Sequence, residues 1–379
     1  MRIGIPLKSH DPAWGGPGVY TVEIVKHLLA LDRHNEYVLL YPSATGPMKY
    51  FGQYQGYHNV FEVDTRVTHG WYSDLIVLPR IAQNQAIDVL FSPFMAIPLR
   101  GHFHKVMTIH GAERYTVPGL LTWKGYLKWY VMEKLMLPQA DCILAVSHTM
   151  QRDFCKALGF PPERVRTTYL GVNPTFRRLT GGECLQRVRE RYQLPKDFIL
   201  FVGLLFPNKN FTNLLQGFQA IAKTIPHRLV VVGGRRWKYK HDVAQVQILG
   251  LTNRVQFLNF VPQEDLVALY NLATCFVFPS LYESFGLAQL EAMACGCPVV
   301  AASTGALPEI AGGAAILCDP RDPADIGRAI YTLICDPALR AAYIEKGIAR
   351  ARDFTWERCA TETLQVLESV CQSRLTVSA

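Results

Sequence analysis

The sequence lacks several patterns that would assign it to common classes of protein. It has no dense run of Lys or Arg, no uninterrupted apolar run near 18 residues, no CxxC pair and no paired His spacing. The first absence gives no support to a nucleic-acid partner, and the second argues against a membrane-spanning helix. The other two argue against a zinc site.

Cysteine is present, but its placement does not indicate cross-links. The ten cysteines include Cys295 and Cys297, which flank one glycine in an apolar context where small buried thiols are common. Free thiols fit a reducing compartment. Because no secretory leader is visible at the start, we expect a cytoplasmic protein, with peripheral contact to the inner face of the membrane as the closest approach to lipid.

Length and composition predict two domains. The chain has 379 residues, of which 49% are hydrophobic and 18% charged, so it can build two ordinary cores. Lys and Arg outnumber Asp and Glu by 39 to 31, which gives a formal net charge of +8. Such a mild basic excess suits phosphate-bearing substrates or an anionic lipid surface.

Short apolar runs alternate with helical patterns along the whole chain. We predict strands at 1–7, 36–41, 88–91, 105–109, 141–146, 165–169, 197–203, 227–233, 255–257 and 275–279. Strands that alternate with helices predict a parallel doubly wound sheet in each half. Between the halves, residues 177–196 are charged and contain glycine, which indicates a linker and the first helix of a second domain. Residues 45–75 show weak periodicity and predict no element.

A glycine-containing loop follows the first predicted strand. Gly15, Gly16 and Gly18 precede a helix predicted over residues 19–31, an order that can set backbone amides against phosphate. The glycines do not form a clean G-x-G-x-x-G, and the second strand ends in Tyr41 rather than in the acidic residue that dinucleotide binding needs. A dinucleotide-dependent oxidoreductase is therefore a weaker alternative.

The most informative stretch begins at Glu283 and reads ESFGLAQLEAMACGCPVV. Glu283 and Glu291 are eight residues apart, so one straight helix would not align them. We expect Glu283 in a loop, a helix that begins between Phe285 and Leu287, and Glu291 in the second turn of that helix. The amides at the helix start would then lie between the two carboxylates, where an anion is favoured. A phosphate site with hydroxyl acceptors on either side describes a nucleotide-sugar pocket.

This E-x7-E spacing, continued by EAMACGCPVVAASTGALPEI, resembles the donor-site signature of retaining glycosyltransferases of family 4. The resemblance covers nearly the whole chain and is most specific at 198–215 and 280–320. It implies an α/β protein of GT-B architecture, in which two Rossmann-like, doubly wound parallel-sheet domains face each other across a cleft. The implied parts are an acceptor domain at 1–176, a donor domain at 177–355 and a helix at 356–379 that packs back on the first domain.

The same resemblance implies an activity and a set of site residues. A hexose of mannose or glucose type would move from a GDP- or UDP-linked donor to a glycan or lipid-linked acceptor, with retention of configuration. Roles in catalysis are implied for His110 beside the sugar, Lys209 at the diphosphate and Glu283 at the sugar end. Donor contacts are implied for Gly15, Gly16, Gly18, Lys209, Glu283, Ser284, Phe285, Gly286, Leu287 and Glu291, with Arg235 and Arg236 as weaker candidates.

Two departures bear on the chemistry. The chain contains no D-x-D, the short divalent-metal signal of the other main glycosyltransferase fold, so we expect no metal and no other cofactor. Leu204, Leu205 and Phe206 stand where the family often has an arginine. Lys209 would then carry a larger share of the leaving-group charge. A catalytically weak nucleotide-sugar-binding protein of the same fold is the second alternative.

Residues 115–137 combine aromatic, apolar and basic side chains at near-helical spacing. The apolar positions are Trp123, Leu127, Tyr130, Val131 and Leu135, and the interspersed lysines are Lys124, Lys128 and Lys134. Such a helix can lie at an anionic membrane surface. It can equally be a domain helix whose aromatic side chains are core and whose lysines are solvated. The sequence leaves both interpretations open.

Overall fold

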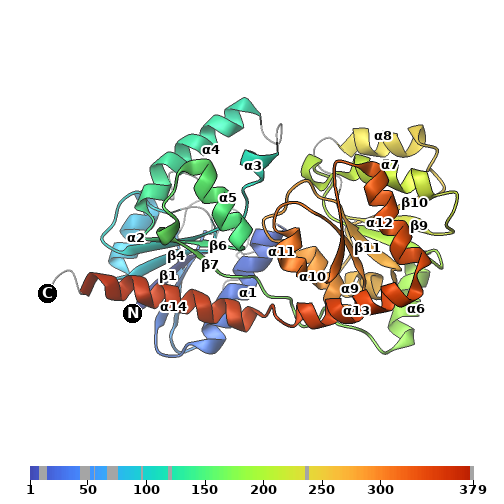
Figure 1. Cartoon of the computed structure of the whole chain (residues 1–379). Helices are drawn as coiled ribbons and strands as arrows, with labels where there is room; N and C mark the ends of the chain where they lie inside the picture. The colour runs from blue at the N-terminus through green and yellow to red at the C-terminus, as the bar shows by residue number, and fades with distance from the viewer. Residues whose placement is uncertain are drawn as a thin grey trace. The chain divides into compact units, whose positions relative to one another are not determined.

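The computed structural model describes residues 1–7, 15–42, 52–54, 56–65, 76–94, 97–117, 122–234 and 239–375. The chain forms two compact units, each built around one sheet (Figure 1). The first unit comprises Met1–Ala112, Leu121–Gly171 and Trp356–Ala379. The second comprises Glu113–Leu120 and Val172–Thr355.

The sheet of the first unit has seven strands in the order β3-β2-β1-β4-β5-β6-β7. All neighbouring strands run parallel, and most strand residues are buried, which fits a parallel sheet covered on both faces. The strands are β1 (Arg2–Pro6), β2 (Glu36–Tyr41), β3 (Val60–Asp64), β4 (Val89–Ser92), β5 (His104–Ile109), β6 (Cys142–Ala145) and β7 (Val165–Thr167).

Strand β3 was not predicted, because the sequence of residues 45–75 indicated no helix or strand. It is an edge strand, and its side chains are half-buried or exposed. An edge strand needs no continuous apolar run, so its pattern is weak.

Helices cover both faces of this first sheet. In Figure 1, α1 and α14 lie on one face, and α2, α4 and α5 lie on the other. Helix α1 begins at Gly16, three residues before the predicted start, because Pro17 is accommodated in the first turn. The helices are α1 (Gly16–Leu31), α2 (Leu78–Asn84), α4 (Trp123–Met136), α5 (His148–Leu158) and α14 (Trp356–Leu375).

The second unit contains a six-stranded parallel sheet in the order β10-β9-β8-β11-β12-β13. Its strands are β8 (Phe198–Val202), β9 (Arg228–Val232), β10 (Val255–Asn259), β11 (Cys275–Phe278), β12 (Val299–Ala302) and β13 (Ala315–Cys318). Its longer helices are α6 (Gly182–Arg191), α7 (Phe211–Ile221), α8 (Tyr239–Ile248), α9 (Gln263–Leu272), α10 (Leu287–Ala294), α12 (Pro323–Cys335) and α13 (Pro337–Ala351), and the short ones are α3 (Glu113–Thr116) and α11 (Leu307–Ala311). The parallel sheet predicted for each half is confirmed.

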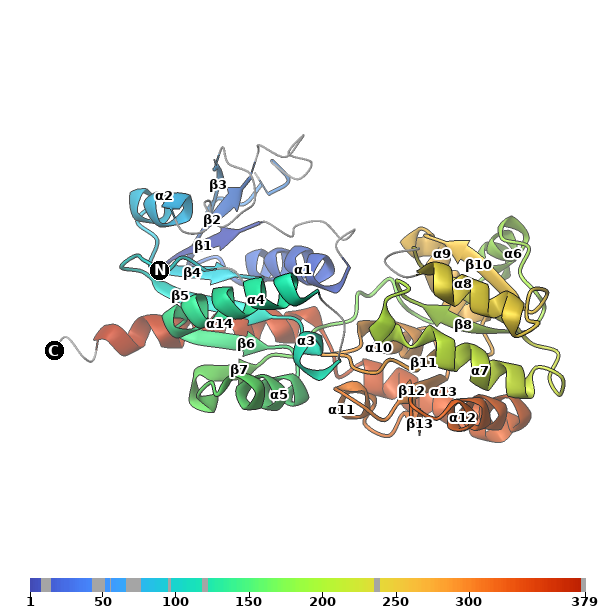
Figure 2. The ribbon, with the colours of Figure 1, turned by 90° about the horizontal axis from the view of Figure 1, so that it is seen from above.

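Helices α7 and α12 lie side by side on one face of the second sheet (Figures 1 and 2). They meet at two glycines. A Cβ built on Gly217 would lie 2.5 Å from the Pro323 carbonyl oxygen, and one built on Gly327 would lie 2.6 Å from the Gly217 carbonyl oxygen. Only residues without a side chain permit this close approach.

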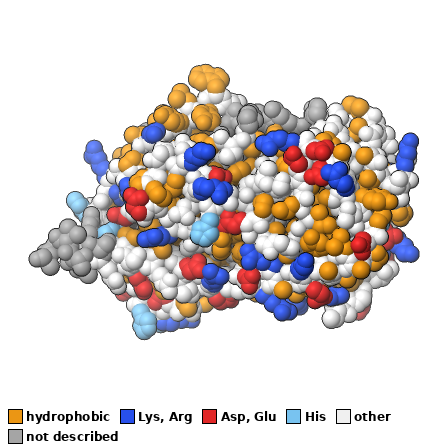
Figure 3. All heavy atoms as spheres, in the orientation of Figure 1, with side chains coloured by type: hydrophobic (Ala, Val, Ile, Leu, Met, Phe, Trp, Pro, Cys, Tyr) orange, Lys and Arg blue, Asp and Glu red, His pale blue; other side chains and the backbone are white. Residues whose placement is uncertain are grey.

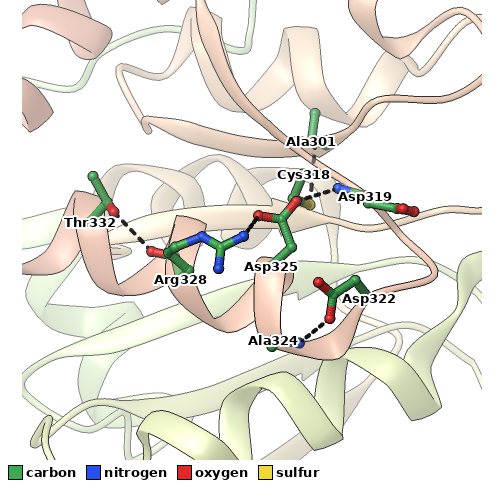
Figure 4. Close-up of polar contacts among 8 residues, drawn as sticks. All are labelled: Ala301, Cys318, Asp319, Asp322, Ala324, Asp325, Arg328 and Thr332. Atoms are coloured by element: carbon green, nitrogen blue, oxygen red, sulfur yellow. Dashed lines mark hydrogen bonds and ion pairs between the residues drawn. The ribbon is translucent and has the colours of Figure 1, made fainter.

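Polar contacts fix the turn that leads from β13 into α12 (Figure 4). The Asp322 carboxylate accepts a hydrogen bond from the Ala324 amide at 2.9 Å, which caps the helix. One turn on, Asp325 accepts from the Asp319 amide at 2.7 Å and pairs with Arg328. These bonds hold the carboxyl end of β13 against the start of the helix.

The two sheets share one feature that positions ligands. In each, the strand order reverses beside the first strand of the unit, between β1 and β4 and again between β8 and β11. In open α/β sheets, ligands bind outside the carboxyl ends of the strands at such a reversal.

None of the described helices is long and apolar enough to cross a membrane.

Candidate active site

Lys209 and Glu283 meet at the strand-order reversal of the second unit. Lys209 follows β8 and Glu283 follows β11, and these two strands are neighbours in the sheet. The Lys209 Nζ atom lies 2.6 Å from Glu283 Oε1, and the side chains are only 19% and 12% exposed. Partial burial reduces solvent screening, so the Coulomb attraction within this pair is larger than in a fully exposed pair. Two side chains for which the resemblance implied separate catalytic roles are therefore in direct contact.

The surroundings of Lys209 hold its ammonium group in place. Its Nζ lies 4.9 Å from the centroid of the Phe278 ring, within cation–π range. Its aliphatic stem passes Gly203, where a Cβ built on the backbone would lie 3.7 Å from Lys209 Cδ. The side chain of Leu205 is buried, so this loop contributes apolar packing where the family often supplies an arginine.

The backbone of Glu283 is fixed by the segment after β12. The Ala306 amide donates to the Glu283 carbonyl oxygen at 2.9 Å. Gly305 has a φ of +59°, and a Cβ there would lie 2.6 Å from the Glu283 carbonyl oxygen and 2.8 Å from its nitrogen. Gly305 therefore positions Glu283. Its role was not identified from the sequence, although Gly305 belongs to the run STGALPEI that follows the two glutamates.

The predicted helix start is confirmed at α10, which begins at Leu287. Its N-cap residue, Gly286, has a φ of +96°, and a Cβ there would lie 2.5 Å from Leu307 Cδ2. The left-handed backbone favours glycine, and a side chain here would also displace Leu307. The Phe285 ring packs edge-on against Phe354 at 5.9 Å, and Ser284 is buried. First-turn amides of a helix have no acceptor within the helix and favour an anion.

Glu291 lies in the second turn of α10, as expected, and its side chain faces a tyrosine. The Tyr270 hydroxyl lies 3.4 Å from Glu291 Oε2. Burial raises the pKa of Glu291 to about 7. The carboxyl group can therefore change its protonation state near neutral pH. Tyr270, on α9, was not identified from the sequence, since nothing local links it to Glu291.

An uncharged histidine lies in the first unit, at the carboxyl end of β5. His110 Nε2 lies 2.7 Å from the Pro93 carbonyl oxygen, and its ring packs edge-on against Tyr20 at 4.8 Å. Burial lowers the pKa of His110 to about 4, so the ring is neutral at pH 7. Because a carbonyl can only accept, Nε2–H is the donor, and Nδ1 is left as an acceptor for a ligand hydroxyl.

The three predicted glycines lie at the start of α1. Gly15 is the N-cap residue with a φ of +76°, and Gly15 and Gly16 are exposed while Gly18 is buried. Among the described residues, no atom lies within 4 Å of a Cβ built on Gly15 or Gly16. The preceding loop, residues 8–14, and the weaker candidates Arg235 and Arg236 lie outside the described residues.

Metal-ligand side chains do not cluster in the part of the chain that the structure describes. Among those residues, no group of three or more His, Cys, Asp or Glu side chains could hold a metal ion.

The chain resembles known proteins over most of its length. A family model described as "Glycosyltransferase Family 4" matches residues 14–176, and one described as "Glycosyl transferases group 1" matches residues 186–350. O-antigen chain mannosyltransferase B of Escherichia coli is 36% identical over 268 residues, which cover 68% of this chain and 68% of that protein. The chain belongs to glycosyltransferase family 4. A serotype-specific mannosyltransferase, WbdA of Escherichia coli, is 27% identical, and the match covers 71% of this chain and 33% of that protein.

Solved structures share the fold of this glycosyltransferase at low sequence identity. HepE of Anabaena, in complex with UDP-glucose, has a TM-score of 0.76 at 20% identity, and the match covers 97% of this chain and all of that one. WaaG, a glycosyltransferase involved in lipopolysaccharide biosynthesis, has a TM-score of 0.73 at 15% identity and covers 96% of this chain and 99% of that one. The predicted GT-B architecture of two Rossmann-like domains is confirmed.

Helix α4 of the glycosyltransferase has an exposed apolar face. This exposure contradicts the interpretation in which the aromatic side chains of residues 115–137 belong to a domain core. Trp123 is 72% exposed, and the other apolar positions on this face are 45–53% exposed. Figure 3 shows hydrophobic side chains at the top of the view, over α4. The opposite side of the helix is buried at Glu133 and Met136. The interpretation in which the aromatic residues are core is wrong.

Proposed function

We propose that this glycosyltransferase is a retaining enzyme that transfers a hexose, of mannose or glucose type, from a GDP- or UDP-linked donor to a hydroxyl of a glycan or lipid-linked acceptor. The observation that carries the proposal is the Lys209–Glu283 ion pair of 2.6 Å at the strand-order reversal. A cation for the diphosphate and a carboxylate for the sugar hydroxyls stand beside the first turn of α10. The relative named as a mannosyltransferase and the neighbour bound to UDP-glucose support this class of donor.

The chemistry divides between the two ends of the donor. As the bond between sugar and diphosphate breaks, negative charge grows on the leaving oxygen. Lys209 and the amides of Gly286 and Leu287, at the start of α10, stabilise this charge. Glu283 accepts hydrogen bonds from sugar hydroxyls, and Glu291 accepts them from the ribose. The acceptor hydroxyl attacks the face that the diphosphate leaves, and the diphosphate takes its proton, which retains configuration.

We propose that the reaction needs no divalent metal. In metal-dependent transferases, an ion bridges and neutralises the diphosphate. Here Lys209 is an ordered cation in a partly buried place, and protein dipoles can supply the rest. Activity should therefore survive excess chelator. Loss of activity with EDTA, followed by recovery with Mn²⁺ or Mg²⁺, would refute metal independence.

We further propose that the acceptor is presented at a membrane and that α4 makes reversible contact with it. Trp123 and Tyr130 are exposed, and Lys124 and Lys134 lie 5.7 Å and 5.6 Å from the centroids of these rings. Aromatic rings favour headgroup depth, and each lysine near an anionic surface contributes about 1 kcal/mol. The side chain of Lys128, also expected to contribute, lies outside the described residues.

A second candidate function is nucleotide-sugar binding with little catalysis. The specific observation in its favour is the buried Leu205, in a loop where family members often carry an arginine. With one cation fewer at the diphosphate, the leaving group would be less stabilised, although the donor could still bind.

One experiment distinguishes these candidates. The purified enzyme is incubated with a panel of UDP-, GDP- and ADP-hexoses, with and without membrane lipid extract, and release of nucleoside diphosphate is measured. We expect release with one UDP- or GDP-hexose that rises in the presence of acceptor. Binding of the same donor by calorimetry without any release would favour the second candidate.

A further inference from the structure

A cavity of about 370 Å³ lies in the second unit, away from the residues assigned to the donor. Thr274 and Pro298 line it, and they immediately precede β11 and β12. The cavity is therefore at the amino edge of the sheet, whereas Lys209 and Glu283 follow the carboxyl ends of the strands. None of the described donor-site residues lines it.

Two arginines line this cavity, and both have donor groups to spare. Arg340, on α13, uses Nη1 for the carbonyl oxygens of Leu333 and Ile334, at 3.1 and 3.0 Å. Its Nε and Nη2 groups have no hydrogen-bond acceptor among the described residues. The side chain of Arg178 is 64% exposed and makes one long contact, 3.6 Å, with the exposed Glu345. Such a surface pair contributes little, so Arg178 can exchange it for a ligand.

The backbone around Arg178 is already fixed. The Asn271 side chain accepts a hydrogen bond from the Leu179 amide at 2.8 Å and donates one to the Arg177 carbonyl oxygen at 3.0 Å. One amide group thus holds both neighbours of Arg178. The arginine stem lies over Gly296, where a Cβ would be 3.6 Å from Arg178 Cδ. The backbone that carries Arg178 is therefore ordered before a ligand binds, so binding an anion requires only the side chain to be ordered.

The lining suits one class of ligand. Two guanidinium groups match the geometry of a phosphate, which each can bind through paired hydrogen bonds. The half-buried Thr274 can add a hydroxyl, and Leu185 and Ile344 supply an apolar wall. A volume of about 370 Å³ lies in the usual range for small-molecule sites and leaves space for an organic body beside the phosphate.

We propose that this cavity binds the phosphate monoester of a small metabolite, with Arg178 and Arg340 on the phosphate. Figure 1 shows α6, α9, α10 and α13, the helices around the site, gathered on one side of the second sheet. The assignment goes beyond the proposed transferase reaction. The amino edge of the second sheet would then hold a second ligand site, which stays accessible while the donor is bound at the carboxyl edge.

The test is calorimetric titration of the full chain with glucose 6-phosphate, in the presence of saturating UDP or GDP. Saturation occupies the donor site, so the measured heat belongs to the second one, and the result does not depend on catalysis. We expect binding that persists with nucleotide present, weaker binding of inorganic phosphate and none of glucose. Absence of binding, competition by the nucleotide, or equal binding of glucose would overturn the proposal.

Variants assign the binding to the arginines. Arg178→Gln should weaken glucose 6-phosphate binding about tenfold, because it removes a charge-assisted pair of hydrogen bonds. The matched control is Arg328→Gln, which removes an exposed guanidinium on α12, outside the cavity lining. Arg340→Lys keeps the charge but loses the planar fork, and should also weaken binding. Equal weakening in Arg178→Gln and Arg328→Gln, or no weakening in either arginine variant of the cavity, would overturn the assignment.

Discussion

The carboxyl edges of the two sheets share a reversal of strand order but differ in the charge of their side chains. In the second unit, the edge carries the Lys209–Glu283 ion pair and the titratable Glu291. The corresponding edge of the first unit carries exposed glycines and His110, which burial keeps neutral. Strand order fixes where a ligand binds, but side chains decide what chemistry occurs there. The edge of the second unit thus carries charged side chains, whereas His110 at the edge of the first unit is neutral.

The largest effect should come from removing the cation of the charged edge. Lys209→Ala should lower turnover roughly 100- to 1000-fold, the usual result of losing one group that stabilises transition-state charge, about 2.7–4 kcal/mol. Nucleoside affinity should change little. Steady-state kinetics on the best donor measures both, with Lys223→Ala, an exposed lysine of the same unit, as control.

Two outcomes would contradict a special role for charge at the edge of the second unit. A Lys209→Ala rate within threefold of the parent would remove this lysine from the mechanism. An equally large loss in His110→Gln would mean that charge does not distinguish the two edges.

Two glycines test whether the position of Glu283 matters. Gly305→Ala and Gly313→Ala both place a side chain on a left-handed backbone, with φ of +59° and +84°, but only the first would collide with Glu283. The left-handed backbone should cost each variant about 1–2 kcal/mol of stability. Gly305→Ala should lose more than this, because its Cβ also collides with the Glu283 backbone. Activity should fall on the order of tenfold to a hundredfold in Gly305→Ala alone, since small displacements of a reacting group are costly. Thermal melts and kinetics on both variants check this, and parallel losses of activity would contradict it.

The pH dependence of stability should differ in sign between the two edges. Burial raises the pKa of Glu291 from 4.5 to about 7, so the folded protein keeps a proton that the unfolded chain releases. The contribution of Glu291 to the free energy of unfolding therefore falls as pH rises from 4.5 to 7. Burial lowers the pKa of His110 from 6.5 to about 4. The contribution of His110 to the free energy of unfolding therefore falls as pH decreases from 6.5 to 4.

Glutamine variants isolate these two contributions. As pH rises from 5 to 7, the stability of Glu291→Gln should increase relative to that of the parent. As pH falls from 6.5 to 5, the stability of His110→Gln should increase relative to that of the parent. Each change should be on the order of 2 kcal/mol. Urea unfolding at several pH values provides the measurement. A difference from the parent that does not vary with pH would show that the residue does not titrate as stated.

The smallest effect concerns the surface of the first unit. Trp123→Ala should weaken association with anionic vesicles a few-fold at low salt, since one interfacial ring among several is lost. Added salt should weaken the parent further, because the lysine contribution is screened. Vesicle co-sedimentation is the measurement, with Tyr331→Ala, an exposed aromatic of the second unit, as control. Failure of the parent protein to sediment with anionic vesicles would remove α4 as the membrane contact.

Some of this protein could be predicted from its sequence. Most buried parallel strands are continuous apolar runs, so a parallel sheet in each half was predictable, and the start of α10 followed from Gly286 and the helical pattern after it. Strands β12 and β13, of four residues each, were not predicted. The edge strand β3 was missed because its side chains are half-buried or exposed and form no continuous apolar run.

Other features were decided by tertiary structure alone. An apolar stripe on α4 does not tell whether another element covers it, and here none of the described elements buries Trp123. Lys209 and Glu283 are separated by 74 residues, and they meet only because β8 and β11 are adjacent in the sheet. The raised pKa of Glu291 comes from burial, which depends on the packing of α9 and α10. Sequence patterns report the periodicity of one segment, whereas these properties arise from distances between segments that only the strand order and helix packing define.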